Sequence, residues 1–402
     1  MNMPKLYALL PCLFGIEAAL KEEVLQLGYA KDAIETFDGE IRVSLGSDYV
    51  SELFRLNLEL RRAERVRLEI ARIPGVVDFD SFFNLTANLP WEIFVPRGAQ
   101  IRVDGSSRKS KLFGVPSLQS LAKKAIINRL LEAWQIKDGR ISEDRRRGEI
   151  RIHFSFVSDS LSLSIDSSGE GLHKRGYRPL THEAPLRETV AAAILYYTHF
   201  QNILRFHETL YDPCCGSGTF LIEAALIMAK IAPGLKRSFA LETLPIAEPA
   251  RFASLREEAR ARIQRDPSAK LAASDISTRA IQDAIANAER AGVAELIDFK
   301  QCDLTQLGET SLRRWPGGPG LILTNLPYGE RLGDQESARK LTETLLDLSF
   351  KSTGASWQLA FLQLDEAMPD DAPRADKKRK VYNGQMAVTL HQYFKHRLRT
   401  QR

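Results

Sequence analysis

The chain has 402 residues, which is too long for a single hydrophobic core and typical of two or three domains. Its hydrophobic content of 44% and charged content of 27% predict a soluble globular protein. The net charge of +5 is too small to establish a nucleic-acid partner by itself. The sequence shows no signal peptide and no run of about 20 apolar residues, so we expect neither secretion nor a transmembrane segment.

The four cysteines lack the paired spacing of a zinc site, and we therefore expect no metal. Cys214 and Cys215 are adjacent and are interpreted as small apolar residues in a loop. Free thiols fit a reducing compartment, so we expect the protein in the cytoplasm.

The first 165 residues alternate short apolar strands with helices and contain no glycine-rich loop. Helices are expected where apolar residues recur every three or four positions. The predicted strands are 6–10, 41–43, 66–73, 101–104, 150–157 and 161–165, and the predicted helices cover 16–27, 50–58 and 118–125. This is an α+β pattern, unlike the strand–helix alternation that follows residue 185.

Basic residues are concentrated between Arg97 and Lys124, a stretch that contains seven of them and a single acid, Asp104. The apolar residues of the helix predicted at 118–125 share one face, which leaves Lys123 and Lys124 on the opposite, exposed face. Together with the basic and serine-rich segment 106–111, this face offers contacts to phosphate. The alternative interpretation is a solvated surface without a ligand.

A charged segment, 169–178, joins the two halves of the chain. Its cations and Tyr177 could hold a phosphate and a nucleotide, or the segment could be no more than a charged linker between glycines. Pro185 is predicted to begin a helix, because proline suits the first turn, with a buried face at Leu186, Val190, Ile194 and Tyr197.

A glycine-rich turn occupies 211–219 and is followed by an apolar stretch. Such a turn between a strand and a helix lets the backbone approach a ligand closely. It is not the dinucleotide fingerprint, because Leu221 stands where the third glycine would be. Alone, a glycine-rich turn is a weak signal.

Two acidic residues follow predicted strands, Asp275 after 270–274 and Asp303 after 297–302. A carboxylate at a strand end suits two ribose hydroxyls, and a second could accept a hydrogen bond from an adenine amine. Each could instead cap a helix, since aspartate is a good N-cap. The order of the glycine loop, Asp275, Asp303 and the segment described next favours a ligand site along one sheet edge.

The apolar run 321–324 ends in Asn325, Leu326, Pro327 and Tyr328. Proline fixes the local backbone, so a planar amine could donate to the Asn325 side-chain oxygen and to the Leu326 backbone oxygen. Tyr328 could stack on the ring that carries the amine. The alternative is an ordinary strand end with a proline turn.

These segments resemble a known family. Residues 212–219 resemble motif I of class I S-adenosylmethionine methyltransferases, and 325–328 resemble motif IV of the amino-methyltransferases, with Leu326 in the second place. Residues 10–17 with Gly28 resemble the ferredoxin-like domain that opens THUMP-containing RNA methyltransferases, and 56–66 and 119–126 resemble the THUMP domain. Residues 172–178 resemble the linker of bacterial guanine-N2 methyltransferases, and 232–237 the large-subunit ribosomal RNA branch.

The resemblance implies an α/β fold, a Rossmann-like class I methyltransferase sheet preceded by an α+β ferredoxin-like and THUMP RNA-binding region. The expected ranges are 1–45 (ferredoxin-like), 46–165 (THUMP), 166–184 (linker) and 185–402 (methyltransferase). Residues 380–386 should belong to the closing antiparallel hairpin, and residues 374–380 should form a loop rich in basic residues. Some members of this branch carry a second, C-terminal methyltransferase domain, which we do not expect here.

The implied function is S-adenosylmethionine-dependent N2-methylation of a guanosine in large-subunit (23S) ribosomal RNA. The implied catalytic residues are Asn325, Leu326, Pro327 and Tyr328. The implied cofactor residues are Asp212, Cys214, Gly216, Gly218, Thr219, Asp275, Ile276, Asp303, Leu304 and Asn325. The implied RNA-binding residues are Arg108, Lys109, Lys111, Lys123, Lys124, His173, Lys174 and Arg175.

Several alternatives stay open. The same reaction on transfer RNA is the nearest, followed by N6-methylation of adenine in nucleic acid and methylation of a protein glutamine. A non-enzymatic RNA-binding module is a further alternative, against which the intact cofactor residues count. The sequence predicts neither the methylated nucleotide nor the oligomeric state.

Overall fold

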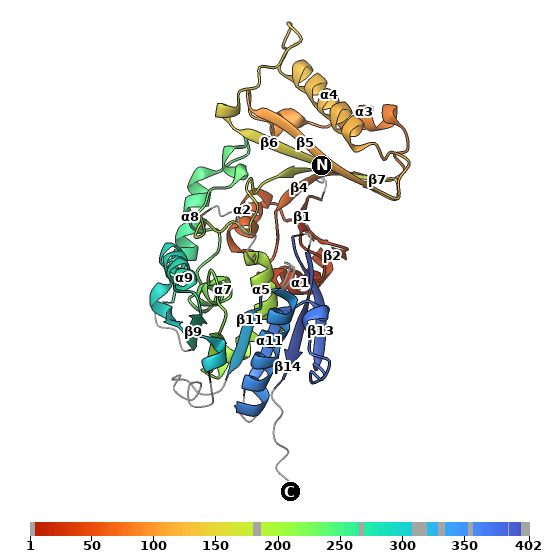
Figure 1. Ribbon diagram of the computed structural model, residues 1–402. Helices are drawn as coiled ribbons and strands as arrows, with labels where there is room; N and C mark the ends of the chain where they lie inside the picture. The colour runs from red at the N-terminus through yellow and green to blue at the C-terminus, as the bar shows by residue number, and fades with distance from the viewer. Residues whose placement is uncertain are drawn as a thin grey trace. The chain divides into compact units, whose positions relative to one another are not determined.

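The computed structural model describes residues 5–179, 186–264, 269–307, 320–328, 334–352, 357–384 and 386–394. The chain divides into two compact units, each containing one seven-stranded sheet. Unit 1 is formed by 1–12, 24–172 and 237–258, and unit 2 by 13–23, 173–236 and 259–402. Figure 1 labels their helices and strands.

The sheet of unit 1 has the order β2-β3-β1-β4-β7-β6-β5. Its strands are β1 (Tyr7–Pro11), β2 (Ile34–Phe37), β3 (Glu40–Ser44), β4 (Arg67–Ile73), β5 (Gln100–Arg108), β6 (Glu149–Val157) and β7 (Ser160–Asp166). Neighbours are antiparallel except β5 and β6, which run parallel. The α+β pattern predicted for this half is therefore confirmed.

Helices α3 (Phe79–Ala87) and α4 (Val115–Ala133) pack together on the β5–β7 part of this sheet (Figure 1). Along β6 buried and half-buried residues alternate, because successive side chains point to opposite faces. The buried set includes Phe154 and Phe156, whose rings lie edge-on to Phe82 of α3 at 5.7 and 5.3 Å. These aromatic contacts form the core of this part of unit 1.

Much of the segment 232–265, which was predicted within the methyltransferase domain, belongs to unit 1. Residues 237–258 belong to unit 1, and most of helix α8 (Pro249–Ala261) lies in this range. Phe252 stacks on Phe54 of α2 (Tyr49–Glu59) with ring centroids 4.2 Å apart, and Phe239 meets the same ring edge-on. The segment therefore completes an aromatic core around Phe54.

The sheet of unit 2 has the order β10-β9-β8-β11-β12-β14-β13. Its strands are β8 (Thr209–Asp212), β9 (Lys270–Asp275), β10 (Ile297–Gln301), β11 (Leu321–Asn325), β12 (Gln358–Gln363), β13 (Lys377–Asn383) and β14 (Met386–Tyr393). The first five in this order are parallel, and β14 and β13 close the sheet as an antiparallel hairpin. This is the expected Rossmann-like class I methyltransferase sheet.

The remaining α-helices described are α1 (Glu17–Gln26), α5 (Glu188–Tyr197), α6 (Phe200–Arg205), α7 (Thr219–Met228), α9 (Thr278–Ala291) and α11 (Asp334–Asp347). Helix α11 contributes Leu345 and Leu346 to an apolar cluster with Tyr211, Ile322 and Phe361 of the central strands. Helix α7 packs between two others, since it contacts both α5 and α9.

Two predictions about boundaries differ from the structure. The helix expected to begin at Pro185 begins at Glu188, because Arg187 has the extended backbone of an N-cap, and Pro185 itself lies outside the described residues. The loop of basic residues expected at 374–380 is strand from Lys377 onward, since this stretch pairs with β14.

Candidate active site

The predicted cofactor residues gather at one edge of the unit 2 sheet. From β8 the chain continues to β9 and β10 on one side, and then returns to β11 and β12 on the other. Such a switch in strand order leaves a crevice beyond the carboxyl ends of β8 and β11. Asp212, Asp275 and Asn325 are the last residues of β8, β9 and β11, and Asp303 lies two residues beyond β10.

Asp212 is the most buried acid of this edge, with 2% of its surface exposed. Its Oδ1 accepts hydrogen bonds from the Thr324 hydroxyl at 2.6 Å and from the Cys214 backbone N–H at 3.1 Å. Burial, assisted by the negative charge of Asp275, nevertheless raises the pKa of Asp212 to about 7. A carboxylate this poorly solvated would be stabilised by a cation, such as an ammonium group.

The turn after Asp212 needs its glycines for two different reasons. Gly216 has φ +50° with nothing within 4 Å of the position of a Cβ atom, so its backbone faces open space. Gly218 has φ +80°, and a Cβ atom there would lie 3.1 Å from that of Ala284 in α9. Gly216 therefore leaves room for a ligand, whereas Gly218 permits close packing of the turn on α9.

Asp275 is tied to this turn and is not the cap of α9. Its Oδ2 accepts from the Gly216 backbone N–H at 3.0 Å and its Oδ1 from Ser277 at 2.9 Å. The N-cap of α9 is Ser277, whose hydroxyl accepts from the Ala280 N–H. The neighbouring Ile276 is 66% exposed, beside the carboxylate.

Asp303 does have the capping role that was its alternative interpretation. Its Oδ1 accepts from the Thr305 backbone N–H at 2.9 Å, at the start of the short helical turn Leu304–Gln306. Leu304 is 3% exposed and belongs to the apolar cluster beneath the sheet edge. Its side chain therefore packs inside.

The segment after β11 presents polar groups on a fixed turn. Asn325 is half-buried, and the Tyr328 hydroxyl donates to its Oδ1. The Leu326 side chain is fully buried, and the Pro327 carbonyl accepts from Gln363 Nε2 at 3.3 Å. Sequence reasoning gave Tyr328 a stacking role only, whereas here it also orients the Asn325 amide.

Three residues that support the site were missed from the sequence. Thr324 binds Asp212, Gln363 holds the Pro327 turn, and the Ser274 hydroxyl lies 2.6 Å from that of Tyr211. Each contacts another strand or the turn that follows one, so no local pattern marks it.

The linker residues predicted to bind RNA have different surroundings. Lys174 is exposed and His173 is half-buried. Arg175 is 4% exposed, and its Nε lies 3.5 Å from Glu223 Oε1 in α7, so its charge has an internal partner in place of a phosphate. The nearby Arg178 pairs with Glu188 at 2.7 Å and reaches the Thr219 hydroxyl at 3.3 Å. Thr219 begins α7, so this linker braces the helix that follows the glycine turn.

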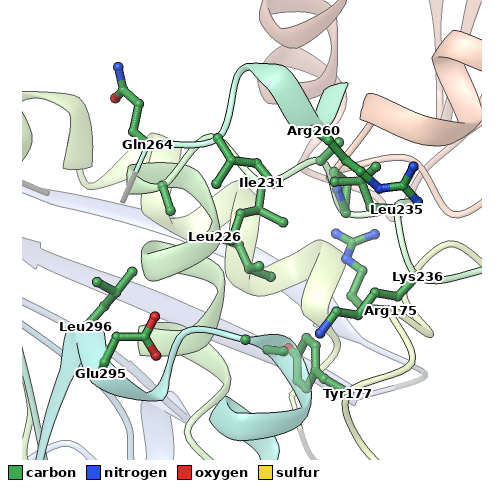
Figure 2. A pocket seen from close by; sticks show the side chains of 16 residues that line it. Arg175, Tyr177, Leu226, Ile231, Leu235, Lys236, Arg260, Gln264, Glu295 and Leu296 are labelled. Carbon is green, nitrogen blue, oxygen red and sulfur yellow. The ribbon is translucent and has the colours of Figure 1, made fainter. Parts of the chain in front are cut away.

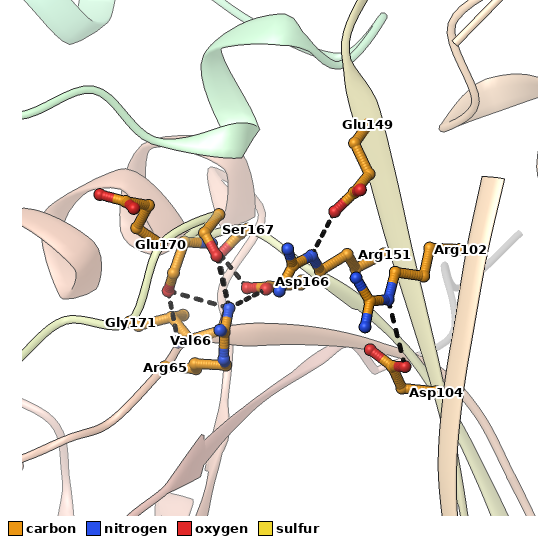
Figure 3. A network of polar contacts seen from close by, with 12 residues as sticks. Arg65, Val66, Arg102, Asp104, Glu149, Arg151, Asp166, Ser167, Glu170 and Gly171 are labelled. Carbon is orange, nitrogen blue, oxygen red and sulfur yellow. Dashed lines mark hydrogen bonds and ion pairs between the residues drawn. The ribbon is translucent and has the colours of Figure 1, made fainter. Parts of the chain in front are cut away.

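Several basic residues of unit 1 are already paired. Lys123 is half-buried, not exposed as predicted, because its ammonium lies 2.8 Å from Glu143. Figure 3 shows Arg102 beside Asp104 and Arg151 beside Glu149 on β5 and β6, and Arg65 beside Asp166. By contrast Arg108, Lys109, Lys111 and Lys124 are exposed, with one distant partner for Arg108, Asp38 at 3.8 Å.

A cavity of about 560 Å³ lies in unit 2 but apart from the strand ends (Figure 2). Its lining includes Leu226 and Ala229 at the end of α7 and Ala291 and Gly292 at the end of α9. In a parallel sheet these helix ends lie at the edge opposite the carboxyl ends of the strands. The Lys236 ammonium on its rim donates to the Arg290 carbonyl at 2.6 Å, as a cation at a helix C-terminus does.

The described residues contain neither a metal site nor a helix that could cross a membrane. Within 5–394, apart from the stretches that the structure does not describe, no group of three histidine, cysteine, aspartate or glutamate residues is arranged to hold a metal ion. Over the same ranges no helix has the length and apolar character that crossing a bilayer requires.

Comparison with known proteins agrees with this geometry. Residues 175–393 match the RMKL-like methyltransferase domain, residues 8–67 the RlmL ferredoxin-like domain and residues 76–166 the THUMP domain. The chain belongs to the RMKL-like methyltransferase family. The predicted family and order of domain types are thereby confirmed.

Relatives of this methyltransferase fall into two length classes. "Putative RNA methyltransferase YpsC" of Bacillus subtilis is 34% identical, and the match covers 94% of each chain. "Ribosomal RNA large subunit methyltransferase K/L" of Syntrophotalea carbinolica is 35% identical over 94% of this chain. The chain spans about half the length of that relative, 52%.

Two solved structures have a TM-score of 0.84 to this methyltransferase and cover 98% of it. One, SMU.472, is described as a putative methyltransferase complexed with SAH, is 31% identical and is covered in full. The other is described as a predicted N6-adenine-specific DNA methylase from Listeria monocytogenes, is 33% identical and is covered to 97%. The first supports the predicted S-adenosylmethionine cofactor, since SAH is what that cofactor becomes after losing its methyl group.

Proposed function

We propose that this methyltransferase transfers a methyl group from S-adenosylmethionine to the exocyclic N2 amine of a guanosine in large-subunit ribosomal RNA. The observation that carries the proposal is the convergence of Asp212, Asp275 and Asn325 on one sheet edge, in a chain that also has a THUMP domain. The name of the K/L relatives supports ribosomal RNA as the substrate.

The residues at the strand ends fit the cofactor. Asp212 would bind the ammonium of its methionine part. The backbone at Gly216, whose N–H binds the Asp275 carboxylate, faces open space that the cofactor could occupy. Asp275 would bind the ribose hydroxyls, with Ile276 beside it, and Asp303 the adenine amine. Bound there, the cofactor supplies an electrophilic sulfonium methyl group.

The protein's own part in the reaction is to position the amine. The lone pair of a guanine amine is delocalised into the ring, so the nitrogen is a poor nucleophile. Accepting its two hydrogens at Asn325 Oδ1 and at the Leu326 carbonyl would direct that lone pair. Alignment of two reactants can contribute roughly 7–11 kcal/mol. No strong base is required, because the nitrogen attacks first, the sulfur keeps the electron pair of the broken S–CH3 bond, and the proton on the methylated nitrogen is then acidic enough to be lost to water.

The Tyr328 hydroxyl and the turn at Pro327 support this role. By donating to Asn325 Oδ1, Tyr328 fixes the amide so that its oxygen has one lone pair left for the substrate amine. Gln363 holds the Pro327 carbonyl, which keeps the Leu326 carbonyl in a constant orientation. The segment 325–328 contains no cysteine, so covalent attack on a pyrimidine ring is not supported.

Adenine N6-methylation is the second candidate, because one structural neighbour is described as an N6-adenine-specific methylase. Both bases present a planar amine, and Asn325 with Leu326 would accept its hydrogens in either case. Transfer RNA is the alternative substrate for the same guanine reaction.

Cytoplasmic localisation of this methyltransferase stays a prediction.

The deciding experiment supplies labelled S-adenosylmethionine to unmodified large-subunit ribosomal RNA, transfer RNA and adenine-containing DNA in parallel. Each product is digested to nucleosides and identified by mass. N2-methylguanosine from ribosomal RNA alone is the expected result. The same nucleoside from transfer RNA alone would replace the substrate, and methyladenosine would overturn the base.

A further inference from the structure

An exposed aromatic residue lies among exposed cations of unit 1. Phe113 is 79% exposed, the highest value among the large hydrophobic residues of the described chain. Its neighbour Leu112 is 4% exposed and anchors the loop between β5 and α4. Lys109 and Lys111 in the same loop are exposed, and Arg108 ends β5 directly before it.

This loop is held by the turn between β6 and β7. The Lys111 backbone N–H donates to Asp159 Oδ1 at 2.7 Å, and the Asp159 N–H donates to the Ser110 hydroxyl at 2.9 Å. The Ser107 hydroxyl donates to the Leu112 carbonyl at 2.5 Å. These bonds fix residues 108–113, which we call the basic loop.

Fixed geometry matters because it lowers the entropy lost on binding. Lys109 has φ +52°, a conformation that lysine rarely adopts and that persists only where the surroundings hold it. Because these hydrogen bonds hold the loop from both sides, Phe113 is exposed to solvent at the end of a fixed segment.

The charge around Phe113 favours a polyanion. Arg108, Lys109 and Lys111 contribute three positive charges within six residues, against Asp38 at 3.8 Å from Arg108 and the Asp159 carboxylate, which the Lys111 N–H already binds. An aromatic face surrounded by cations is the usual platform for an unpaired base and its flanking phosphates.

We propose that the basic loop binds an unpaired nucleotide of the RNA, with the base stacked on Phe113 and the adjacent phosphates near Lys109 and Lys111. This inference rests on the proposed function, and it goes further because it names an aromatic contact and requires a single-stranded element in the substrate. A fully paired RNA satisfies the lysines but leaves Phe113 without a base.

The test compares two labelled RNAs of equal length, a hairpin with an unpaired loop and a blunt duplex, by fluorescence anisotropy over a range of salt concentrations. Phe113→Leu removes the ring, Phe113→Tyr retains it, and Phe206→Leu is the matched control at another exposed phenylalanine, 61% exposed in unit 2. Calorimetry of each variant checks that the fold is unchanged.

We expect Phe113→Leu to bind the hairpin about 5- to 150-fold more weakly, which corresponds to roughly 1–3 kcal/mol for the loss of one stacked base. The salt dependence of its affinity should be unchanged, because no charge is removed. Phe113→Tyr should restore binding, and Phe206→Leu and all duplex affinities should match the wild type.

Equal affinity of wild type and Phe113→Leu for the hairpin would overturn the inference, and so would an equal loss of affinity for the hairpin and the duplex. Failure of the proposed function has a different signature. In that case the wild-type chain would bind the hairpin through Phe113 and yet form no N2-methylguanosine.

Discussion

Substituting Asp212 by asparagine separates the stability of the free protein from its affinity for the cofactor. The Thr324 hydroxyl and the Cys214 backbone N–H both donate to Oδ1, which asparagine retains. The substitution therefore removes the charge and keeps the hydrogen bonds. We expect it to stabilise the free protein above pH 7 and to weaken the cofactor site.

The magnitude follows from the pKa of the Asp212 carboxyl, which burial raises from 3.8 to about 7. Because the folded value is raised, the contribution of this group to stability is fully present below about pH 4 and is lost as the pH rises through about 7. At about 1.4 kcal/mol per pKa unit, the loss amounts to about 4 kcal/mol at pH 8. Between pH 5 and pH 8 the stability gain of Asp212→Asn should therefore grow by about 2–3 kcal/mol.

Affinity should change in the opposite direction. Binding an ammonium group requires the ionised carboxylate, so wild-type affinity for S-adenosylhomocysteine should fall about tenfold from pH 8 to pH 6. The asparagine variant should bind about 10- to 100-fold more weakly at pH 8, with little dependence on pH. Titration calorimetry at both pH values measures the affinities, and scanning calorimetry without ligand measures stability.

Asp283→Asn is the matched control, because its side chain is 65% exposed on α9 and lies 4.0 Å from Arg279. It should change neither quantity. A wild-type affinity that is the same at pH 6 and pH 8, or an Asp212→Asn variant less stable than the wild type at pH 8, would refute the reasoning.

Three further predictions concern the site and the RNA surface. Asn325→Ala should abolish methyl transfer in the labelled assay and leave S-adenosylhomocysteine affinity near the wild-type value; a loss below about tenfold, roughly 1.4 kcal/mol, would contradict its assigned role. Gly218→Ala should lower the free energy of unfolding by about 1–3 kcal/mol through its contact with Ala284, whereas Gly216→Ala should cost less stability and more cofactor affinity. Lys124→Ala should reduce the slope of log affinity against log salt by about 0.7–0.9, and Lys123→Ala by less because Glu143 already neutralises it; equal slopes for both variants would remove this distinction.

The sequence predicted strands β8, β9, β10 and β11 and the residues at their ends because these features are local. An apolar run followed by aspartate or asparagine marks a strand end whatever lies beside it. Strand β12 and helix α11 were not predicted, and β2, α3 and α8 were also missed. Their patterns are short or are interrupted by charges, and tertiary packing decides their conformation.

The supporting contacts of the site could not be predicted, since they depend on register between distant strands. Thr324 reaches Asp212 across 112 residues of sequence, because β11 lies beside β8. The internal partner of Arg175, Glu223, lies on a helix whose residues after Thr219 are all apolar except for this acid. A charged residue in such a helix could have indicated a buried ion pair, but its partner is known only from the fold.

Locally unfavourable features of this chain coincide with the two places to which we assign ligands. At the sheet edge, Asp212 is a carboxylate that burial disfavours, and Gly216 holds backbone next to open space. On the basic loop, Lys109 has a rare conformation and Phe113 exposes its ring. Both places therefore carry a free-energy cost in the unliganded protein. A cation bound at Asp212 would offset the first cost, and a base stacked on Phe113 would offset the second. Selection for stability alone would remove such costs wherever function did not require them. Their persistence therefore supports the assignment of both the sheet edge and the basic loop as ligand sites.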